Sequence, residues 1–281
     1  MLVAVIYHED FGKQGYSVLR YRIQPSFDRL EELGLIDGED VQVFRPEPVP
    51  IELLEAAHTK DHIENIRQDR HYHAALLSAG SVLLASELVS EGKAKSAFAY
   101  TGTAGHHASQ GSCWGFCYFN DVAMSIIRLK ELGLKRFLII DVDPHFGDGT
   151  RNFFGDDPNV FHINFNSGTG TSYDPVKNNY DIGLGWAAED EEFLKELEGV
   201  LLLAGDFDFQ LCYVIFGHDS HKDDYGGFDL SLGAYPKMAS MIKDFVGERG
   251  LVFVLSGGSN IEVGCRAIPD VIAVLAGRWP Y

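Results

Sequence analysis

Short apolar segments alternate with longer amphipathic segments along almost the whole chain. The apolar segments are expected to be strands, at residues 2–7, 41–44, 96–100, 137–142, 160–163, 211–216 and 251–255. The segments between them are expected to contain helices, at residues 16–33, 74–90, 121–132, 190–203, 232–246 and 261–275. A strand followed by a helix, repeated in this way, predicts parallel βαβ units around a buried sheet, and therefore an α/β fold.

Unusual polar segments follow four of the expected strands. They are "TGTAGHHASQGSCWGFCYFND", "DVDPHFGDGT", "GHDSHKDD" and "SGGSN". In parallel α/β sheets, ligands bind at the carboxyl ends of the strands, so these four segments are expected to meet in one site. The chain shows no repeat, no low-complexity segment and no linker, which predicts a single domain over residues 1–281.

The segment "DVDPHFGDGT" places Asp143 and His145 two positions apart, and such side chains share a face of an extended chain. A carboxylate beside an imidazole suits Zn²⁺, but two protein ligands are too few for a stable site. Asp219 in "GHDSHKDD" is the best candidate for a third ligand, with His218 and His221 as competing ligands in the same segment. Asp, His and Asp would leave an open position, as a catalytic zinc site requires.

Two adjacent histidines, His106 and His107, lie in the loop after the third expected strand. Neighbouring side chains point to opposite sides of an extended chain, so each histidine can find its own carboxylate. Asp141 and Asp148 are the carboxylates nearest the expected metal ligands. An imidazole held by a carboxylate is oriented and made more basic, which fits a general base acting on a metal-bound water.

Composition narrows the partners and the compartment. The formal net charge is −18, so nucleic acid is not expected as a direct partner, whereas cationic substrates or basic tails would be attracted. The same charge also serves simple solubility. No run of 18 apolar residues occurs, so no membrane span is expected. The cysteines show no disulfide framework, which predicts reduced thiols and a cytoplasmic location; they are Cys113, Cys117, Cys212 and Cys265.

Six segments together resemble the zinc-dependent histone deacetylase family, which includes acetylpolyamine amidohydrolases. They are "LEAAHTKDHIENI", "GHHA", "GFCYFND", "DVDPHFGDGT", "GHDSHKDD" and "LSGGSNIE", and they occur in the family's order. The resemblance extends from about residue 16 to residue 275. It implies the arginase–deacetylase fold, in which a single parallel eight-stranded sheet is flanked by helices on both faces.

The resemblance implies a role for each matching position. The positions that match the family's zinc ligands are Asp143, His145 and Asp219. Those that match its tandem histidines and their carboxylate partners are His106, His107, Asp141 and Asp148, with His107 usually transferring the proton. Those that match substrate-binding positions are Gly115 and Phe116 on the acyl-lysine tunnel wall, and Gly257 and Gly258. A K⁺ ion behind the zinc stays open, because Asp141 and Asp143 match that site but Asn164 replaces its usual serine.

The implied reaction is amide hydrolysis by a zinc-activated water, with the histidines as general acid and base. In typical members a tyrosine in "GGY" donates to the oxyanion, but here the motif reads "GGS" and Ser259 occupies that position. A serine hydroxyl is too short to reach the same oxyanion. Three interpretations stay open: a water held by Ser259 replaces the phenol, another side chain such as Tyr225 supplies the donor, or the chain only binds acylated ligands or hydrolyses labile ones.

The leading hypothesis is a zinc-dependent deacylase for an acylated amine, which could be a protein lysine, a polyamine or a small metabolite. The alternative is a catalytically weak acyl-ligand binder or sensor. A dimanganese ureohydrolase is least favoured, because "GHDSHKDD" lacks the S-x-D-x-D pattern. No nuclear targeting segment or basic cluster is visible, so a prokaryotic cytoplasmic enzyme is expected. The segment from residue 166 to 181 looks like a short loop, with Asn166 where a rim histidine is common, and is expected to open the tunnel. The oligomeric state is not predicted.

Overall fold

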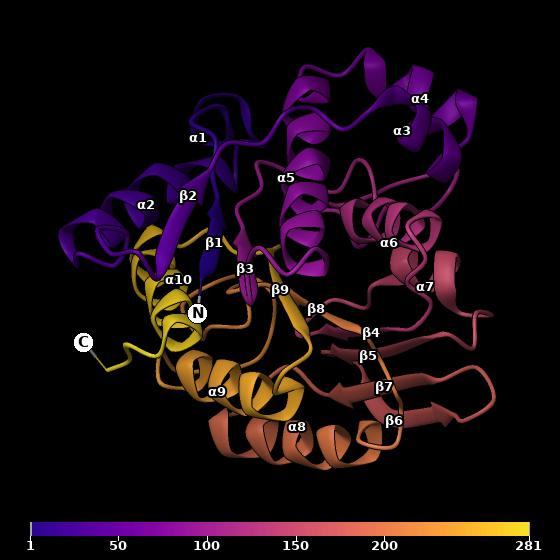
Figure 1. Cartoon of the computed structure of the whole chain (residues 1–281). Coiled ribbons are helices and arrows are strands. Elements are labelled where there is room, and N and C mark those ends of the chain that lie inside the picture. Colours follow the sequence, from indigo (N-terminus) through magenta and orange to yellow (C-terminus); the bar gives the residue numbers. More distant parts are fainter. Residues whose placement is uncertain (1, 281) are drawn as a thin grey trace.

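One sheet of nine strands runs through the computed structural model, which describes residues 2–280 (Figure 1). The strands are β1 (Val3–Ile6), β2 (Val41–Phe44), β3 (Ser96–Ala99), β4 (Phe137–Asp141), β5 (Val160–Asn166), β6 (Thr169–Asp174), β7 (Asn179–Leu184), β8 (Leu211–Phe216) and β9 (Gly250–Leu255). Their order is β2-β1-β3-β9-β8-β4-β5-β7-β6, and every neighbouring pair is parallel except β7 and β6. The predicted α/β fold is confirmed, with eight parallel strands and one added antiparallel edge strand.

The ninth strand corrects the expectation of an all-parallel sheet and of a short loop over residues 166–181. β7 and β6 form an antiparallel hairpin there, and β6 is exposed along most of its length. Its sequence, "TGTSYD", has no apolar run, because an exposed edge strand has no buried face to fill. Asn166 ends β5, and its side-chain oxygen accepts a hydrogen bond from the Gly168 N–H at 2.9 Å.

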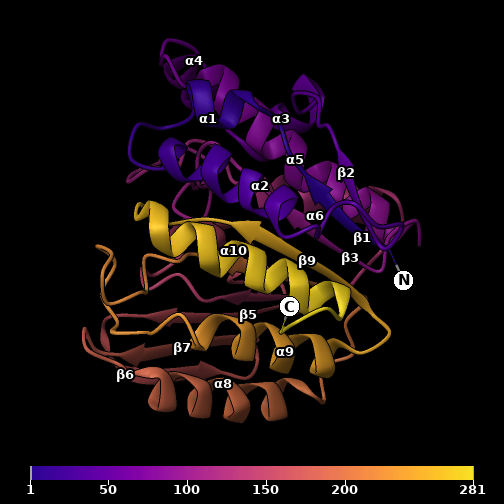
Figure 2. The ribbon, with the colours of Figure 1, turned by 90° about the vertical axis from the view of Figure 1, so that its left-hand side faces the viewer.

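Helices cover both faces of the sheet, as Figures 1 and 2 show. One face packs against α2 (Ile23–Glu32), α8 (Asp190–Ala204), α9 (Ala234–Val246) and α10 (Ile261–Ala276). The other packs against α5 (Tyr72–Ser90) and α6 (Asp121–Glu131). Shorter helices are α1 (Asp10–Gln14), a 3₁₀ turn (Arg20–Arg22), α3 (Ile51–Ala57), α4 (Lys60–Arg67) and α7 (Asp148–Phe154). Each expected helix is present, although the first begins four residues later than predicted and starts as the 3₁₀ turn.

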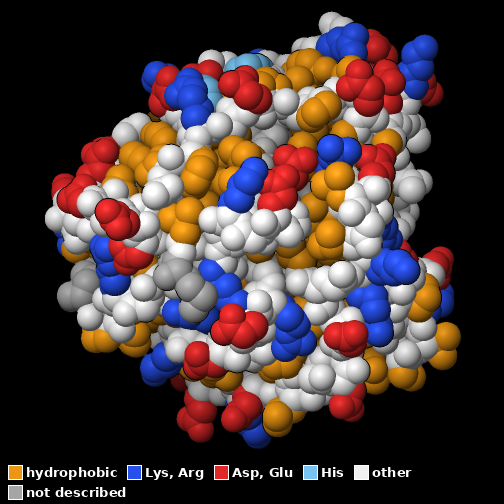
Figure 3. Space-filling view, viewed as in Figure 1, with side chains coloured by type: hydrophobic (Ala, Val, Ile, Leu, Met, Phe, Trp, Pro, Cys, Tyr) orange, Lys and Arg blue, Asp and Glu red, His pale blue; other side chains and the backbone are white. Residues whose placement is uncertain are grey.

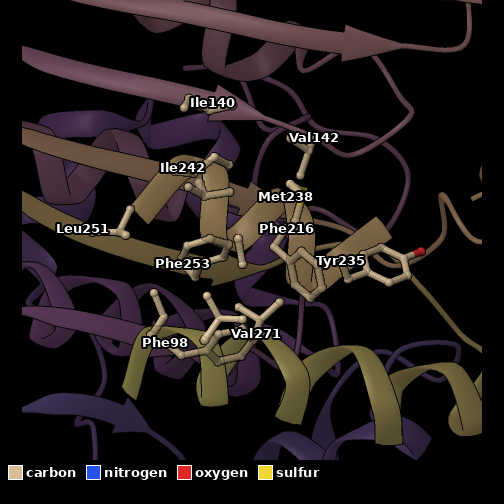
Figure 4. Close-up of a cluster of buried hydrophobic side chains, with 14 of the residues drawn as sticks. Phe98, Ile140, Val142, Phe216, Tyr235, Met238, Ile242, Leu251, Phe253 and Val271 are labelled. Carbon is tan, nitrogen blue, oxygen red and sulfur yellow. The ribbon is translucent and has the colours of Figure 1, made fainter. Parts of the chain in front are cut away.

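The larger core lies between the sheet and the α9–α10 layer (Figure 4). Phe98, Phe216 and Phe253 project from three neighbouring strands towards this layer, where Met238 of α9 and Val271 of α10 meet them. Each of these side chains is almost completely buried. Burial of a side chain of this size contributes about 1.5–3 kcal/mol, so the core fixes the strand ends that carry the polar segments.

The helix α5 is, by length and hydropathy, apolar enough to cross a membrane, but 72% of its most apolar window is buried within the described structure. It contacts β1, β3, β9 and α6, and this packing accounts for its composition. On the face seen in Figure 3, acidic and basic side chains are interspersed. The net charge of −18 therefore forms no patch of a single sign on that face.

Candidate active site

The four polar segments meet at the carboxyl ends of the neighbouring strands β3, β9, β8 and β4. They enclose a cavity of about 210 Å³. The predicted site residues that line it are His106, His107, Gly115, Phe116, Asp143, His145, Asp219, Tyr225 and Gly257. Asp141, Asp148, Gly258 and Ser259 are not part of the lining and lie behind it or beside it. One cavity thus gathers most of the predicted side chains.

Asp143, His145 and Asp219 form a group whose ligand atoms all lie within 4.8 Å of one another. The Nδ1 atom of His145 is 2.9 Å from Asp143 Oδ1 and 3.4 Å from Asp219 Oδ2. Both carboxylate oxygens of Asp219 are buried without a well-formed hydrogen bond among the described residues. Buried acceptors are normally paired, so a cation between these three side chains would complete the site.

The protonation of this group supports the same interpretation. Burial, together with the charge of Asp143, raises the pKa of Asp219 to about 7. Burial also disfavours charge on His145, but its hydrogen bond to Asp143 and its close contact with the Asp219 carboxylate outweigh this and raise its pKa to about 10. For Asp143 the burial is outweighed by His106 and His145, which hold its pKa well below the usual range. Two carboxylates therefore share one imidazolium, and a divalent cation would neutralise them better.

The two competing ligands point elsewhere. His218 is fully buried, with Nδ1 3.2 Å from Asp224 Oδ2 and Nε2 3.1 Å from the Arg22 guanidinium. His221 Nδ1 accepts a hydrogen bond from the Asp223 N–H at 3.1 Å. Neither belongs to the group around Asp143.

Each tandem histidine has its own carboxylate partner. His106 Nδ1 is 2.9 Å from Asp141 Oδ2, and His107 Nδ1 is 2.7 Å from Asp148 Oδ1. Burial disfavours charge on both rings, but at His106 the charges of Asp143 and Asp141 outweigh it and raise the pKa to about 9. At His107, burial and then the charge of His106 lower the pKa to about 3. Without a metal, His106 therefore carries the extra proton of an imidazolium near neutral pH, and His107 stays neutral. The expected gain in basicity is thus found at His106 and not at His107, where burial outweighs the Asp148 carboxylate.

Ser259 does not reach the cavity, because Asp224 holds it. The Ser259 hydroxyl donates to Asp224 Oδ1 at 2.8 Å, and its backbone N–H donates to Asp224 Oδ2 at 2.9 Å. The Asn260 N–H donates to the same oxygen at 2.8 Å. These bonds fasten the "GGSN" turn to the loop after β8, so Ser259 serves here to anchor the turn.

Tyr225 follows Asp224 directly and turns into the cavity instead. Its ring packs against Phe116 at 5.7 Å and His145 at 6.2 Å between centroids. The Gly258 N–H donates to its hydroxyl oxygen at 3.1 Å. Burial, and then the charge of Asp219, raise the pKa of Tyr225 above its usual value, so the phenol keeps its proton.

Two glycines let the backbone of the turn after β9 approach the side chains of the loop after β8. A side chain at Gly257 would collide with the Asp219 carboxylate, and one at Gly258 would collide with His218. Gly258 also has φ +114°, a conformation that favours glycine. Gly257 lies in the cavity lining, whereas Gly258 contributes through its bond to Tyr225.

Three residues that support the site were not predicted from the sequence. Arg22 is fully buried and donates to the carbonyls of Ser256 and Gly257, which supports the turn from behind. Asp224 anchors the turn from the front, and Trp114 covers His107. The Trp in "SCWGFC" beside the tandem histidines was the one local signal.

The position expected to hold potassium contains Asn164. Its Oδ1 accepts from the Gly147 N–H at 3.3 Å, and its buried Nδ2 has no partner among the described residues. Potassium stays a prediction.

Comparisons with known proteins show which family and fold the chain resembles. The model of the family described as "Histone deacetylase domain" matches residues 18–275. A "Probable deacetylase" of Archaeoglobus fulgidus is 26% identical over 99% of this chain and 87% of its own length. "Histone deacetylase 15" of Arabidopsis thaliana is 30% identical over 94% of this chain, which spans only 55% of that protein. The structure titled "Crystal Structure of HDA15 HD domain" superposes with a TM-score of 0.88 at 23% identity, covering 100% of this chain and 91% of that one, and so supports the arginase–deacetylase fold. With a family match over most of its length and a cluster able to hold a metal, the chain belongs to the histone deacetylase family.

Proposed function

We propose that this protein is a zinc-dependent deacylase that hydrolyses an acylated amine. The observation that carries the proposal is the convergence of Asp143, His145 and Asp219 with two His–Asp pairs around one cavity. Two carboxylates and one imidazole suit Zn²⁺ and leave a position open. Bound there, the ion would polarise the acyl carbonyl and lower the pKa of a water.

His107 is proposed as the general base. Asp148 holds its Nδ1, so Nε2, which has no hydrogen-bond partner among the described residues, is the atom left for a proton. Water attacks the acyl carbon while its proton passes to Nε2, and that proton then goes to the amine nitrogen as the C–N bond breaks. The buried His106, which lies 2.9 Å from Asp141, would supply a second imidazole to stabilise the negative charge that develops nearby.

Tyr225 is proposed as the hydrogen-bond donor to the oxyanion. Its hydroxyl oxygen already accepts from the Gly258 N–H, so its own proton is free to point elsewhere. The ring contacts both Phe116 and the metal-group residue His145 in the cavity lining, which supports a position of the phenol near the metal group. This would fill the role that "GGY" provides in typical family members, and it leaves Ser259 with the anchoring role.

The substrate is proposed to be a neutral acyl group on a cationic or peptide-borne amine, with acetyl-lysine and acetylpolyamines as the first candidates. A net charge of −18 favours the approach of such amines. We also propose a cytoplasmic location and a single domain over residues 1–281. No contact with membrane or nucleic acid is proposed.

The function is tested by measuring zinc-dependent release of acetate from acetyl-lysine and acetylpolyamine substrates, with trifluoroacetyl-lysine as a labile control. The expected result is turnover on at least one acetylated amine, lost with a chelator and restored by Zn²⁺. Turnover of the trifluoroacetyl group alone, or tight binding without turnover, would favour the weak binder or sensor. Two Mn²⁺ per chain would favour the ureohydrolase, although the described residues contain one three-ligand cluster.

Replacing Ser259 by Tyr is expected to lower turnover. The change removes the hydroxyl that donates to Asp224 and introduces a second phenol beside Tyr225. The matched Ser259→Ala variant keeps both backbone N–H bonds to Asp224 and should lose far less. Both variants are compared by kcat on the best acetylated substrate. Faster turnover in Ser259→Tyr would show that the oxyanion donor is missing and that Tyr225 does not supply it.

A further inference from the structure

Trp114 covers the ring of His107. The indole and the imidazole are stacked, with their centroids 3.6 Å apart and their planes 28° apart. On its other face, His107 has the ring of His106 at 3.9 Å. His107 is 5% exposed while Trp114 is 51% exposed, so the indole shields the imidazole from solvent.

The same indole binds the carboxylate partner of His107. Its Nε1–H lies 3.0 Å from Asp148 Oδ1 and 2.9 Å from Asp148 Oδ2. His107 Nδ1 lies 2.7 Å from Asp148 Oδ1. One side chain therefore contacts both members of the pair, through its face and through its N–H.

The two His–Asp pairs differ in how they are held. The side chain of Asp141 is fully buried, and the surrounding core fixes it against His106. The side chain of Asp148 is 47% exposed, so water competes for its oxygens and would let it turn. A fixed N–H donor removes this freedom, which gives Trp114 a role that the buried pair does not need.

The backbone places the indole over His107. The next residue, Gly115, has φ +63°, and a side chain there would lie 3.4 Å from His107 Cδ2. The Cys117 N–H donates to the Trp114 carbonyl at 3.3 Å, and the His107 N–H donates to Cys117 Sγ at 3.3 Å. This turn is thus fastened to the loop that carries the histidines.

We propose that Trp114 is a positioning residue for the His107–Asp148 pair, with its N–H holding the carboxylate and its ring holding the imidazole in the plane for proton transfer. The proposal rests on the proposed deacylase function. Trp114 exchanges no proton itself, and its effect is exerted through His107.

The kinetic test uses Trp114→Phe, which keeps a ring and loses the N–H, and Trp114→Leu, which loses both. Trp279→Phe, at an exposed tryptophan outside the cavity lining, is the matched control. We expect kcat to fall about tenfold in Trp114→Phe and about a hundredfold in Trp114→Leu, with KM nearly constant, because a hydrogen bond to a charged group and then the ring contact are lost. In an Asp148→Asn background, Trp114→Phe should add almost no further loss. Fully additive losses, or an effect confined to KM, would overturn the proposal.

A second measurement does not depend on turnover. Diethyl pyrocarbonate modifies accessible imidazoles. Peptide mass analysis of the metal-free protein measures the rate at which His107 is modified. We expect several-fold faster modification of His107 in Trp114→Leu than in wild type or Trp279→Phe. An unchanged rate would overturn the placement of Trp114. A faster rate in a protein that loads zinc but turns over no substrate would support the placement and overturn the deacylase function.

Discussion

Replacing Tyr225 by Phe is expected to lower kcat by about 10²–10³, the usual effect of removing one oxyanion donor. The substitution keeps the ring against Phe116 and His145 and removes only the hydroxyl. Because the interaction is made mainly in the transition state, kcat and kcat/KM should fall together while KM changes little. Steady-state kinetics on the best acetylated substrate, with zinc content measured in the same samples, provides the check.

The loss of the hydroxyl also leaves the Gly258 N–H without its partner, so a structural effect must be separated from a catalytic one. Tyr173→Phe, on the exposed strand β6, is the matched control and should change neither kcat nor stability. A second comparison places Ser259→Tyr in the Tyr225→Phe background, where a new phenol should recover part of the lost turnover. If Tyr225→Phe binds zinc normally and loses less than about threefold in kcat, another group donates to the oxyanion.

The three residues of the metal group could all be predicted from the sequence. Asp143 and His145 could be predicted because they lie two positions apart directly after an apolar strand. In the structure, β4 ends at Asp141 and residues 143–145 form a bend, so the turn brings the two side chains together and not a shared strand face. Asp219 could be predicted because it follows an apolar strand, as Asp143 does. Both strands were expected to be parallel, and parallel strands end at the same edge of a sheet. In the sheet, β8 and β4 are indeed neighbours, which brings the three side chains together.

The role of Ser259 was not accessible in the same way. Its position in "GGS" predicted an empty donor site, but its partner Asp224 lies 35 residues earlier, in a different loop. Trp114 and Asp148 are likewise separated by 34 residues. Contacts between loops depend on the exact path of each turn, such as the left-handed conformations of Gly115 and Gly258, and no periodic pattern encodes them. The edge strand β6 was missed for a related reason, because exposed strands need no apolar residues.

Replacing Asp219 by Asn is expected to abolish activity and to stabilise the metal-free protein at the same time. The variant keeps the shape of the side chain but loses the charge that a divalent ion needs. Since a bound ion supplies several kcal/mol of transition-state stabilisation and 1.36 kcal/mol is tenfold in rate, turnover should fall by about 10³ or more. Calorimetry with Zn²⁺ should show a large loss of affinity.

The stability effect follows from the raised pKa of Asp219. A carboxyl whose pKa is about 7 when folded, against an ordinary value of 3.8, binds its proton more tightly in the folded state than in the unfolded state. Its contribution to stability is therefore fully present below about pH 4 and is lost as pH rises through about 7. At pH 8 the ionised wild-type carboxylate destabilises the metal-free protein, so the neutral Asp219→Asn variant should melt at a higher temperature there, and the difference should shrink towards pH 5.

Zinc should reverse the order of the two melting temperatures, so that wild type melts above Asp219→Asn. The raised pKa of Asp219 costs the metal-free wild type roughly 4 kcal/mol at pH 8. An ion at about 10⁴ times its Kd stabilises the folded wild type by about 5.4 kcal/mol, which exceeds that cost, whereas the variant should gain little. The matched control is Asp223→Asn, a change at a largely exposed neighbouring carboxylate outside the metal group, which should behave as wild type in both states. A metal-free Asp219→Asn protein that melts below wild type at pH 8 would show that Asp219 stabilises the fold. The proposal is supported if Asp219→Asn melts above wild type without metal and below wild type with zinc. This result would mean that the buried charge of Asp219 destabilises the fold and is kept because a cation binds to it.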